Sequence, residues 1–162
     1  MAEHPSLESP ARGALDLSLA ADGRVALALA VVVDVAMHGV AGPVGAAAIA
    51  DRLRQSARGI EPLLQTLSRA GILASARGRG GGYRLARARR DISAGDVARA
   101  VLPDAQVGDA SDLTAAVIAP ALAEAAEAAL ARLDGMSIEA LCRRAVAAGL
   151  APEPPAALTW TI

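Results

Sequence analysis

The sequence predicts a mostly α-helical protein with one small β-hairpin. Alanine is abundant while lysine and phenylalanine are absent, a composition that favours helices and leaves the core to be built from Leu, Val, Ile and Ala. Apolar residues recur at three- and four-residue spacing in several segments, as on one face of a helix. A single glycine-dense turn, residues 78–82, separates two short segments that have the character of strands.

The first helix is predicted over residues 22–38, after a poorly ordered extension at residues 1–17. Asp22 can cap this helix and Gly39 can end it. Because nearly every position between them is apolar, more than one face must be buried, which a second subunit would help to do. His38 falls in the last turn, where it serves either as a favourable partner of the helix dipole or as a ligand or pH sensor.

Two short helices are predicted next. Gly42 and Pro43 break the chain, a helix follows over residues 45–54, and Ser56 caps a second helix that runs to residue 70. Pro62 lies inside the second helix, so that helix should start near residues 58–60 or be distorted in its first turns. Its apolar stripe, which should face the core, consists of Ile60, Leu63, Leu64 and Leu67.

A basic hairpin follows, with strands predicted over residues 72–77 and 83–85. Arg77, Arg79 and Arg84 add three positive charges, and the glycines between the strands let the backbone approach a partner closely. Both features are typical of a wing that contacts a nucleic-acid backbone or minor groove. A phosphate-binding loop is disfavoured, because such loops open a helix and here a strand follows. A flexible hairpin whose arginines serve only solubility is the other alternative.

Three further helices are predicted, over residues 93–101, 112–134 and 138–148. The long one carries leucines among many alanines, and Pro120 implies a kink or a late start. Since this helix lies outside the basic domain, we expect it to bury its apolar stripe against a second copy of itself. Folding back onto its own chain is the alternative.

A helix, a turn, a second helix and a basic hairpin follow one another as in a winged helix-turn-helix domain, whose second helix reads the major groove. The predicted organisation is an N-terminal extension (1–17), a winged helix-turn-helix domain (18–101), a loop (102–111), dimerisation helices (112–148) and a proline-rich tail (149–162). Charge supports this division. Residues 50–99 hold 11 arginines and 4 acidic residues, a net charge of +7, whereas the rest holds 5 arginines and 13 acidic residues, a net charge of −8. A basic block inside an acidic chain indicates a local anionic partner.

Several classes of protein are disfavoured. The single cysteine, Cys142, excludes an intrachain disulfide framework and a metal cluster held by cysteines of one chain, and it is either a small core residue or a redox switch. The longest apolar run, residues 25–33, is far short of the roughly 20 residues that span a bilayer, and the N-terminus does not resemble a signal peptide. We therefore expect a cytoplasmic protein. No nucleophile–base pair or metal-ligand spacing is present, and His4 and His38 are isolated, so an enzyme is not expected.

The chain resembles the Rrf-two family of winged-helix transcription regulators, which includes the iron-sulfur cluster assembly repressor and a nitric-oxide-sensing repressor. The resemblance spans residues 18–141 and is carried by residues 23–27, 42–44, 49–52, 67–73, 77–85 and 92–101. It implies a homodimer crossed through the long helix, with side chains of the second short helix in the major groove and Arg77 in the minor groove of double-stranded DNA. The residues expected to bind DNA are Arg24, Ser56, Arg58, Glu61, Gln65, Arg77, Arg79 and Arg84.

The sequence departs from the family pattern at two places. Gly59 and Pro62 stand where the family usually has an aromatic and a polar residue, which affects base readout. Cluster-bearing members place three cysteines before the long helix, whereas residues 103–111 here contain none, so no iron-sulfur cluster and no other cofactor is expected. The sequence thus predicts a cluster-free, homodimeric, sequence-specific DNA-binding repressor, controlled by a small-molecule effector or by none. The alternative is a protein-interaction or small-ligand module with weakened DNA readout.

Overall fold

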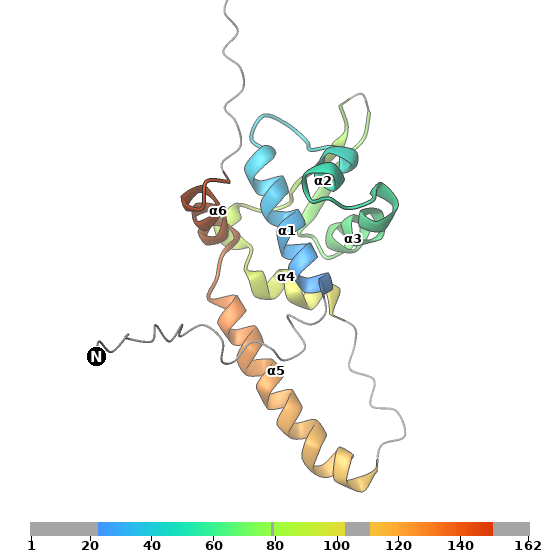
Figure 1. Cartoon of the computed structure of the whole chain (residues 1–162), viewed down its shortest axis with the longest axis vertical. Helices are drawn as coiled ribbons and strands as arrows, with labels where there is room; N and C mark the ends of the chain where they lie inside the picture. The colour runs from blue at the N-terminus through green and yellow to red at the C-terminus, as the bar shows by residue number, and fades with distance from the viewer. Residues whose placement is uncertain (1–22, 79, 103–110, 151–162) are drawn as a thin grey trace, which may run out of the picture.

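Helices make up most of the computed structural model, which describes residues 23–78, 80–102 and 111–150 (Figure 1). The mostly α-helical class with one hairpin is confirmed. The elements are α1 (Gly23–His38), α2 (Ala46–Arg52), α3 (Ala57–Arg69), β1 (Leu73–Ala76), β2 (Gly82–Leu85), the 3-10 turn η1 (Arg89–Asp91), α4 (Ala94–Val101), the π-helical turn η2 (Thr114–Ile118), α5 (Ala119–Asp134) and α6 (Ile138–Ala147).

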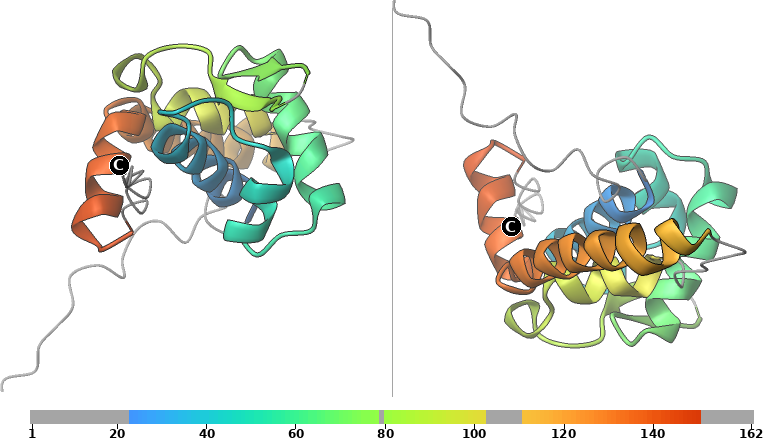
Figure 2. Two further views of the ribbon diagram at one scale, coloured as in Figure 1. Left: turned by 90° about the horizontal axis from the view of Figure 1, so that it is seen from above. Right: turned by 90° about the horizontal axis from the view of Figure 1, so that it is seen from below.

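Helix α1 forms the centre of the domain. In Figures 1 and 2, α2 and α3 lie on one side of α1 and α6 lies on the other, and α1 contacts α4 and β2 as well. Its side chains Ala28, Val31 and Val32 are fully buried. The prediction that more than one face of this helix is buried is therefore confirmed, and it is confirmed within a single chain. The predicted stripe of α3 is buried in the same core.

Serine side chains begin three of the helices. The Ser56 hydroxyl oxygen accepts a hydrogen bond from the Gly59 N–H at 3.1 Å, and Ser137 accepts one from Ala140 at 3.2 Å. Ser93 accepts from the Asp96 N–H at 2.9 Å, while the Asp96 carboxylate accepts from the Ser93 N–H at 3.2 Å, which completes a capping box. Each cap satisfies N–H groups that a helix start leaves without partners.

The two prolines inside helices are accommodated differently. Helix α3 begins at Ala57, before the start near residues 58–60 that Pro62 had suggested, and it runs unbroken through Pro62. Proline has no N–H group, so Pro62 cannot donate a hydrogen bond to the Arg58 carbonyl four residues earlier. Arg58 is exposed to water. Pro120 stands at the start of α5, directly after η2, which agrees with the predicted late start of the regular long helix.

The hairpin is anchored by a third segment of chain. Strands β1 and β2 pair antiparallel, and the Gly81 N–H donates to the Gly78 carbonyl at 2.9 Å across the turn. Val44 exchanges backbone hydrogen bonds of 2.8 Å with Tyr83 in both directions. At Gly82 a Cβ atom would collide with the carbonyl of Val44, so this close approach requires glycine. Strand β1 is shorter than the predicted 72–77 and ends just before Arg77, whereas β2 begins one residue earlier than predicted, at Gly82.

Helix α5 projects from the domain (Figure 1). Three residues of the predicted stripe, Leu113 just before η2, Val117 in η2 and Leu122 near the start of α5, are 66%, 55% and 56% exposed. Leu130 and Leu133, farther along α5, pack partly against the core. Only the last part of the apolar stripe therefore packs on its own chain. That a second copy covers the exposed part stays a prediction.

The segment Thr114–Asp134 is 21 residues long and contains an 18-residue stretch with a mean hydropathy of 1.4, so by length and composition alone it could cross a membrane. The apolar run at residues 25–33 did not point to this segment. Glu124 and Glu127 lie on it and are exposed, and charged groups are costly inside a bilayer. An apolar stripe that also carries carboxylates suits a protein partner better than lipid.

Candidate nucleic-acid interface

One face of α3 is polar and exposed. Arg58, Glu61 and Gln65 are spaced three and four residues apart, so they project from the same side of the helix, and all three are exposed. The opposite side is fixed in the core by fully buried Ile60 and Leu64. The structure thus brings together three of the residues predicted to bind DNA on a rigidly held helix.

The first turn of α3 is shaped by Ser56 and Gly59. The Ser56 hydroxyl oxygen caps the helix by accepting a hydrogen bond from within it. Its O–H group can still donate a hydrogen bond to a phosphate oxygen. A Cβ atom at position 59 would lie 2.9 Å from this oxygen. Glycine at this position therefore leaves room for the cap, and it also leaves this part of the helix without a side chain to read bases.

A buried ion pair fixes α2 against α1. Asp34 is only 7% exposed, yet it lies among the apolar side chains of α1. Arg52 at the end of α2 donates two hydrogen bonds of 2.7 Å to its two carboxylate oxygens, and these bonds raise the pKa of Arg52. His38 Nδ1 lies 2.9 Å from the Asp34 carbonyl oxygen and 3.3 Å from its carboxylate. The cluster sets the angle of α2, and through the connecting turn that of α3.

The wing lies beside α3 and is basic. Arg77 is exposed directly after β1, and Arg84 is exposed on β2 opposite Ala74. Strand β1 packs against α3, so wing and recognition helix move as one unit. Arg79 lies outside the described residues. Arg24 is exposed in the first turn of α1, on a separate element, and the structure does not bring it into contact with the exposed face of α3.

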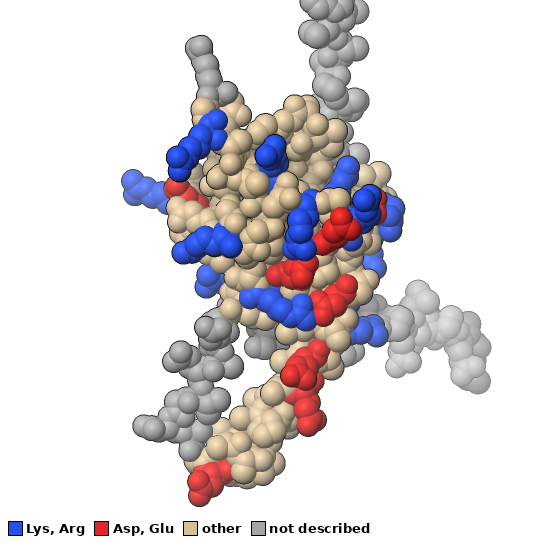
Figure 3. Space-filling view, turned by 180° about the vertical axis from the view of Figure 1, so that it is seen from behind, with Lys and Arg blue, Asp and Glu red and all other residues tan. Residues whose placement is uncertain are grey.

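Charge is divided between domain and projecting helix. Figure 3 shows arginines spread over the body of the domain, whereas the side chains of α5 on this face include acidic ones. Acidic residues of α5 are Glu124, Glu127 and Asp134. The winged domain therefore offers the surface that an anionic partner would contact.

Comparison with known proteins agrees with this geometry. A family model described as Rrf2, iron-dependent transcriptional regulator, matches residues 21–144. The chain belongs to the Rrf2 family. This is the Rrf-two family that the sequence motifs had indicated, and its members are transcriptional regulators and not enzymes.

Curated relatives of this Rrf2 protein match about half of its length or less. The HTH-type transcriptional regulator IscR of Photobacterium profundum is 42% identical over 85 residues, which are 52% of this chain and 48% of that protein. Protein rrf2 of Nitratidesulfovibrio vulgaris is 43% identical over 68 residues, 42% of this chain and 45% of that protein. The matched segment thus spans about half the length of these curated relatives.

Solved structures resemble a larger part of the chain. IscR of T. potens superposes with a TM-score of 0.66 at 29% identity, covering 85% of this chain and 93% of that one. CymR, the global cysteine regulator of B. subtilis, superposes with a TM-score of 0.59 at 25% identity, covering 81% of this chain and 98% of that one. The winged-helix fold is therefore confirmed over both the basic domain and the helices that follow it.

The residues of this chain do not fit an iron-sulfur cluster, although the family is described as iron-dependent. Such clusters are held mainly by several cysteine thiolates, and the chain has one cysteine. That residue, Cys142, is 5% exposed on α6, and burial raises the pKa of its thiol, which disfavours the thiolate. Among the residues that the structure describes, no group of three His, Cys, Asp or Glu side chains could hold a metal ion.

Several features of the site escaped sequence reasoning. The bridge from Val44 to Tyr83 and the ion pair of Asp34 with Arg52 join residues far apart in the chain, and no local periodicity encodes them. A signal for the ion pair was present, since Asp34 interrupts an otherwise apolar helix. A buried carboxylate requires a cation or several donors nearby.

Proposed function

We propose that this chain is a cytoplasmic, sequence-specific DNA-binding repressor that acts as a homodimer without an iron-sulfur cluster. In this proposal α3 enters the major groove and the wing enters the minor groove of double-stranded DNA. The observation that carries it is the exposed polar face of α3 beside a glycine-built basic wing, on a domain of the Rrf2 family. Contacting residues are proposed to be Arg24, Ser56, Arg58, Glu61, Gln65, Arg77, Arg79 and Arg84.

The homodimer is supported by the projecting helix. Leu113, Val117, Ile118 and Leu122 are large apolar side chains that lie exposed on one segment. Single exposed apolar residues are normal, but a run of them on a helix that leaves the domain marks an interaction surface. A second copy offers the same surface, so a two-fold contact would cover both stripes at once.

Affinity and selectivity should reside in different parts of the interface. Arg77 contributes a charge that any DNA sequence would attract, whereas Arg58 and Gln65 can donate to base edges. Gly59 and Pro62 contribute no hydrogen-bonding side chain to the same helix face. We therefore expect weaker sequence discrimination than is usual for a winged helix, with the wing supplying much of the affinity.

A salt titration of DNA binding tests the proposal. Wild type and Arg77→Ala are compared on the DNA upstream of the protein's own gene and on a scrambled duplex of equal length. Arg77→Ala should weaken binding to both duplexes, and the slope of log affinity against log salt should fall by about 0.9 for each phosphate that the variant no longer neutralises. Arg132→Ala, on exposed α5, changes net charge by the same amount and should leave the slope unchanged. Equal binding by Arg77→Ala and wild type would remove the wing from the DNA interface.

A second function is favoured by Gly59 and Pro62. A chain that has lost base readout could keep the fold as a protein-interaction or small-ligand module. The discriminating variants are Arg58→Ala and Gln65→Ala. If these residues read bases, each variant should change the difference in binding free energy between the upstream DNA and the scrambled duplex by about 1–3 kcal/mol. If wild type binds neither duplex at low salt, the module becomes the better account.

A further inference from the structure

A second basic surface lies away from the recognition helix. Two adjoining hollows, with volumes of about 470 and 630 Å³, run along the groove between the end of α1, the base of β2, η1 and α6. Helices α6 and α3 lie on opposite sides of α1 in both Figures 1 and 2. Of the residues that line the groove, only Arg84, at the wing, is proposed above to contact DNA. Arg89, between α1 and α6, lies on the other side of α1 from α3, and its charge needs another explanation.

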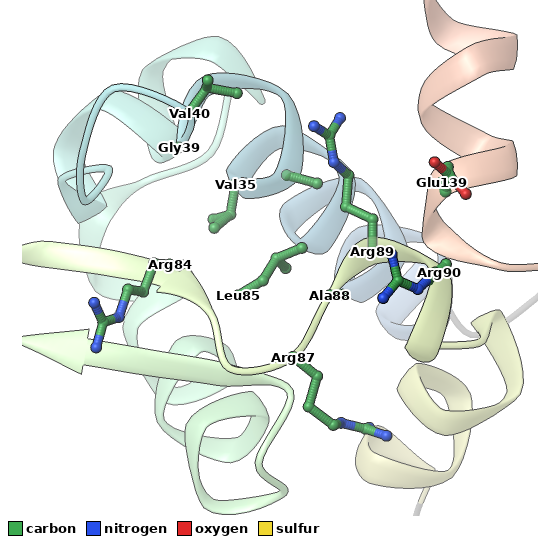
Figure 4. A pocket seen from close by; sticks show the side chains of 11 residues that line it. Val35, Gly39, Val40, Arg84, Leu85, Arg87, Ala88, Arg89, Arg90 and Glu139 are labelled. Atoms are coloured by element: carbon green, nitrogen blue, oxygen red, sulfur yellow. The ribbon is translucent and has the colours of Figure 1, made fainter.

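Arg89 is the central cation of the groove. It lines both hollows, and in Figure 4 its side chain rises between α1 and α6. Three other arginines line the first hollow. Arg87 donates to the Asp96 carboxylate at 3.3 Å, and Arg90 lies 3.6 Å from that of Asp91. The side chain of Arg84 points away from Arg89 in Figure 4. Within the described part of the chain, no carboxylate lies within the 4.0 Å of an ion pair with Arg89. One guanidinium with its planar set of donors is therefore left without a carboxylate partner in a concave surface.

Apolar side chains surround this guanidinium. Val35 and Leu85 lie close together beneath Arg89 in Figure 4, and Val35 is almost fully buried. Met37 and Val146 line the second hollow, and Val146 is 54% exposed. The combination of one cation with apolar walls on both sides is what a small amphipathic anion requires.

A carboxylate opposite Arg89 disfavours a second negative charge on a ligand at this point of the groove. Glu139 on α6 faces the same space from the other wall (Figure 4). Its carboxylate is 3.7 Å from Arg143, so its own charge is only partly compensated by an exposed pair. A second anionic group on the ligand would approach this carboxylate and be repelled.

We infer that the groove binds a small organic monoanion, a carboxylate with a short apolar body, whose charged end pairs with Arg89. The carboxylate would accept two parallel hydrogen bonds from the guanidinium, and the apolar body would cover Leu85 or extend toward Val146. The sequence alone leaves open whether the chain has an effector. The structure assigns the site for one to α6 and the winged domain.

The groove joins the two parts that a regulator must couple. Leu85 ends β2 of the wing, and α6 follows the projecting helix α5. A ligand that contacts both would favour one position of the wing relative to α5, and it can shift DNA affinity only by its difference in affinity for the two positions. This regulatory consequence rests on the proposed DNA-binding function, whereas ligand binding itself does not.

Calorimetric titration of the full chain in the absence of DNA tests the site. The probe is sodium octanoate, with 1-octanol as the probe that lacks the charge and inorganic phosphate as the probe that lacks the apolar body. Octanoate should bind saturably and more tightly than either control. Arg89→Gln should lower its affinity by at least about tenfold, since a charge-assisted hydrogen bond is removed. Arg132→Gln, an exposed arginine on α5, should bind as wild type does, and Arg89→Lys should recover part of the affinity.

Each other outcome overturns the inference. If octanoate shows no saturable binding, or if Arg89→Gln binds it as tightly as wild type, the groove is not a carboxylate site. Equal affinity for 1-octanol would show an apolar surface with no role for Arg89. If octanoate does not bind and Arg89→Gln weakens DNA binding as much as Arg77→Ala does, the groove is an extension of the DNA surface. A failure of wild type to bind DNA would leave the octanoate result unaffected, so the two proposals fail separately.

Discussion

Asp34 is a buried charged residue, and its burial costs free energy of folding. A carboxylate inside an apolar helix loses its hydration, and the paired donors of Arg52 compensate for most of this loss, with His38 Nδ1 3.3 Å away. The pair joins α1 to α2 across the core, at a point where an apolar contact would allow many orientations. We interpret it as the contact that holds the helix-turn-helix in a single geometry.

Removal of Arg52 should therefore destabilise the fold. Because the Arg52 side chain is 33% exposed, water can partly replace it, and Arg52→Ala should lower the free energy of unfolding by about 1–3 kcal/mol. Urea unfolding followed by circular dichroism measures this. Adding Asp34→Asn to Arg52→Ala should recover part of the loss, because the buried charge is then gone. A double variant less stable by the sum of the two single effects would show that the two residues do not interact.

Gly82 is the other residue where substitution has a clear steric consequence. A methyl group there meets the backbone carbonyl of Val44, which cannot rotate away as a side chain can. Gly82→Ala should separate Val44 from the hairpin and lower the free energy of unfolding by about 1–3 kcal/mol. Gly23→Ala is the matched control, because a Cβ atom there meets nothing within 4 Å and the helix start tolerates alanine. Equal melting temperatures for the two variants would contradict the close approach.

Cys142 should be a slow nucleophile. Burial raises the pKa of its thiol, and the nearby positive charge of Arg89 opposes this effect without reversing it. The thiolate is the reactive form, so alkylation by iodoacetamide at neutral pH should be slower in the native protein than in urea by a large factor. Equal rates in the two conditions would show that the thiol is accessible, and the redox-switch alternative would then regain weight.

At the scale of elements, local signals predicted most of the structure. Ser56 begins α3 as predicted, and Ser93 and Ser137 begin α4 and α6 within a residue of the predicted starts, because a cap is decided within four residues of sequence. Pro62 was expected to delay or distort α3, but the helix is unbroken, since buried leucines on its other face outweigh one missing hydrogen bond on the exposed side. The long-range contacts that fix the site, above all those of Asp34 and Val44, depend on the fold as a whole and left no periodic trace.

The junction of α4 and α5 should respond to acid. Arg99 donates two hydrogen bonds of 2.6 Å to the Asp134 carboxylate, which lower the pKa of that group below its usual value. The stabilisation is therefore present above the pKa of about 3.9 that Asp has in an unfolded chain, and it is lost as pH falls through the lower native value. Wild type should be more stable than Asp134→Asn at pH 6, and the difference should shrink as pH falls below the unfolded pKa and vanish once the native carboxylate is protonated. A difference in thermal unfolding that stays constant with pH would exclude this pair as the cause.

At the scale of the whole molecule, the domain and the projecting helix have different requirements. The winged domain has a closed core centred on α1, so it needs no partner to bury its apolar residues. None of the residues of α5 is buried, although leucines recur along it. A helix of this kind is stable only if something covers its stripe, because most helical stability in proteins comes from packing of an apolar face. We have proposed that a second copy does so.

Substitution at Leu122 tests that proposal without disturbing the domain. Leu130 would be a poorer choice, because it packs partly on the core and its loss would also weaken the fold. Leu122 is 56% exposed in the single chain, so Leu122→Asp should leave the melting of an isolated domain unchanged. In a dimer crossed through α5, the same change buries an unpaired polar group in each copy, at a cost of about 1–3 kcal/mol per copy or more. Light scattering should then report a monomer, and affinity for a two-half-site operator should fall more than affinity for a single half-site.

Glu124→Gln, two residues away on the same helix, is the control that adds no buried charge. A wild-type mass of one chain, or an unchanged dimer in Leu122→Asp, would mean that this stripe is not the dimer contact.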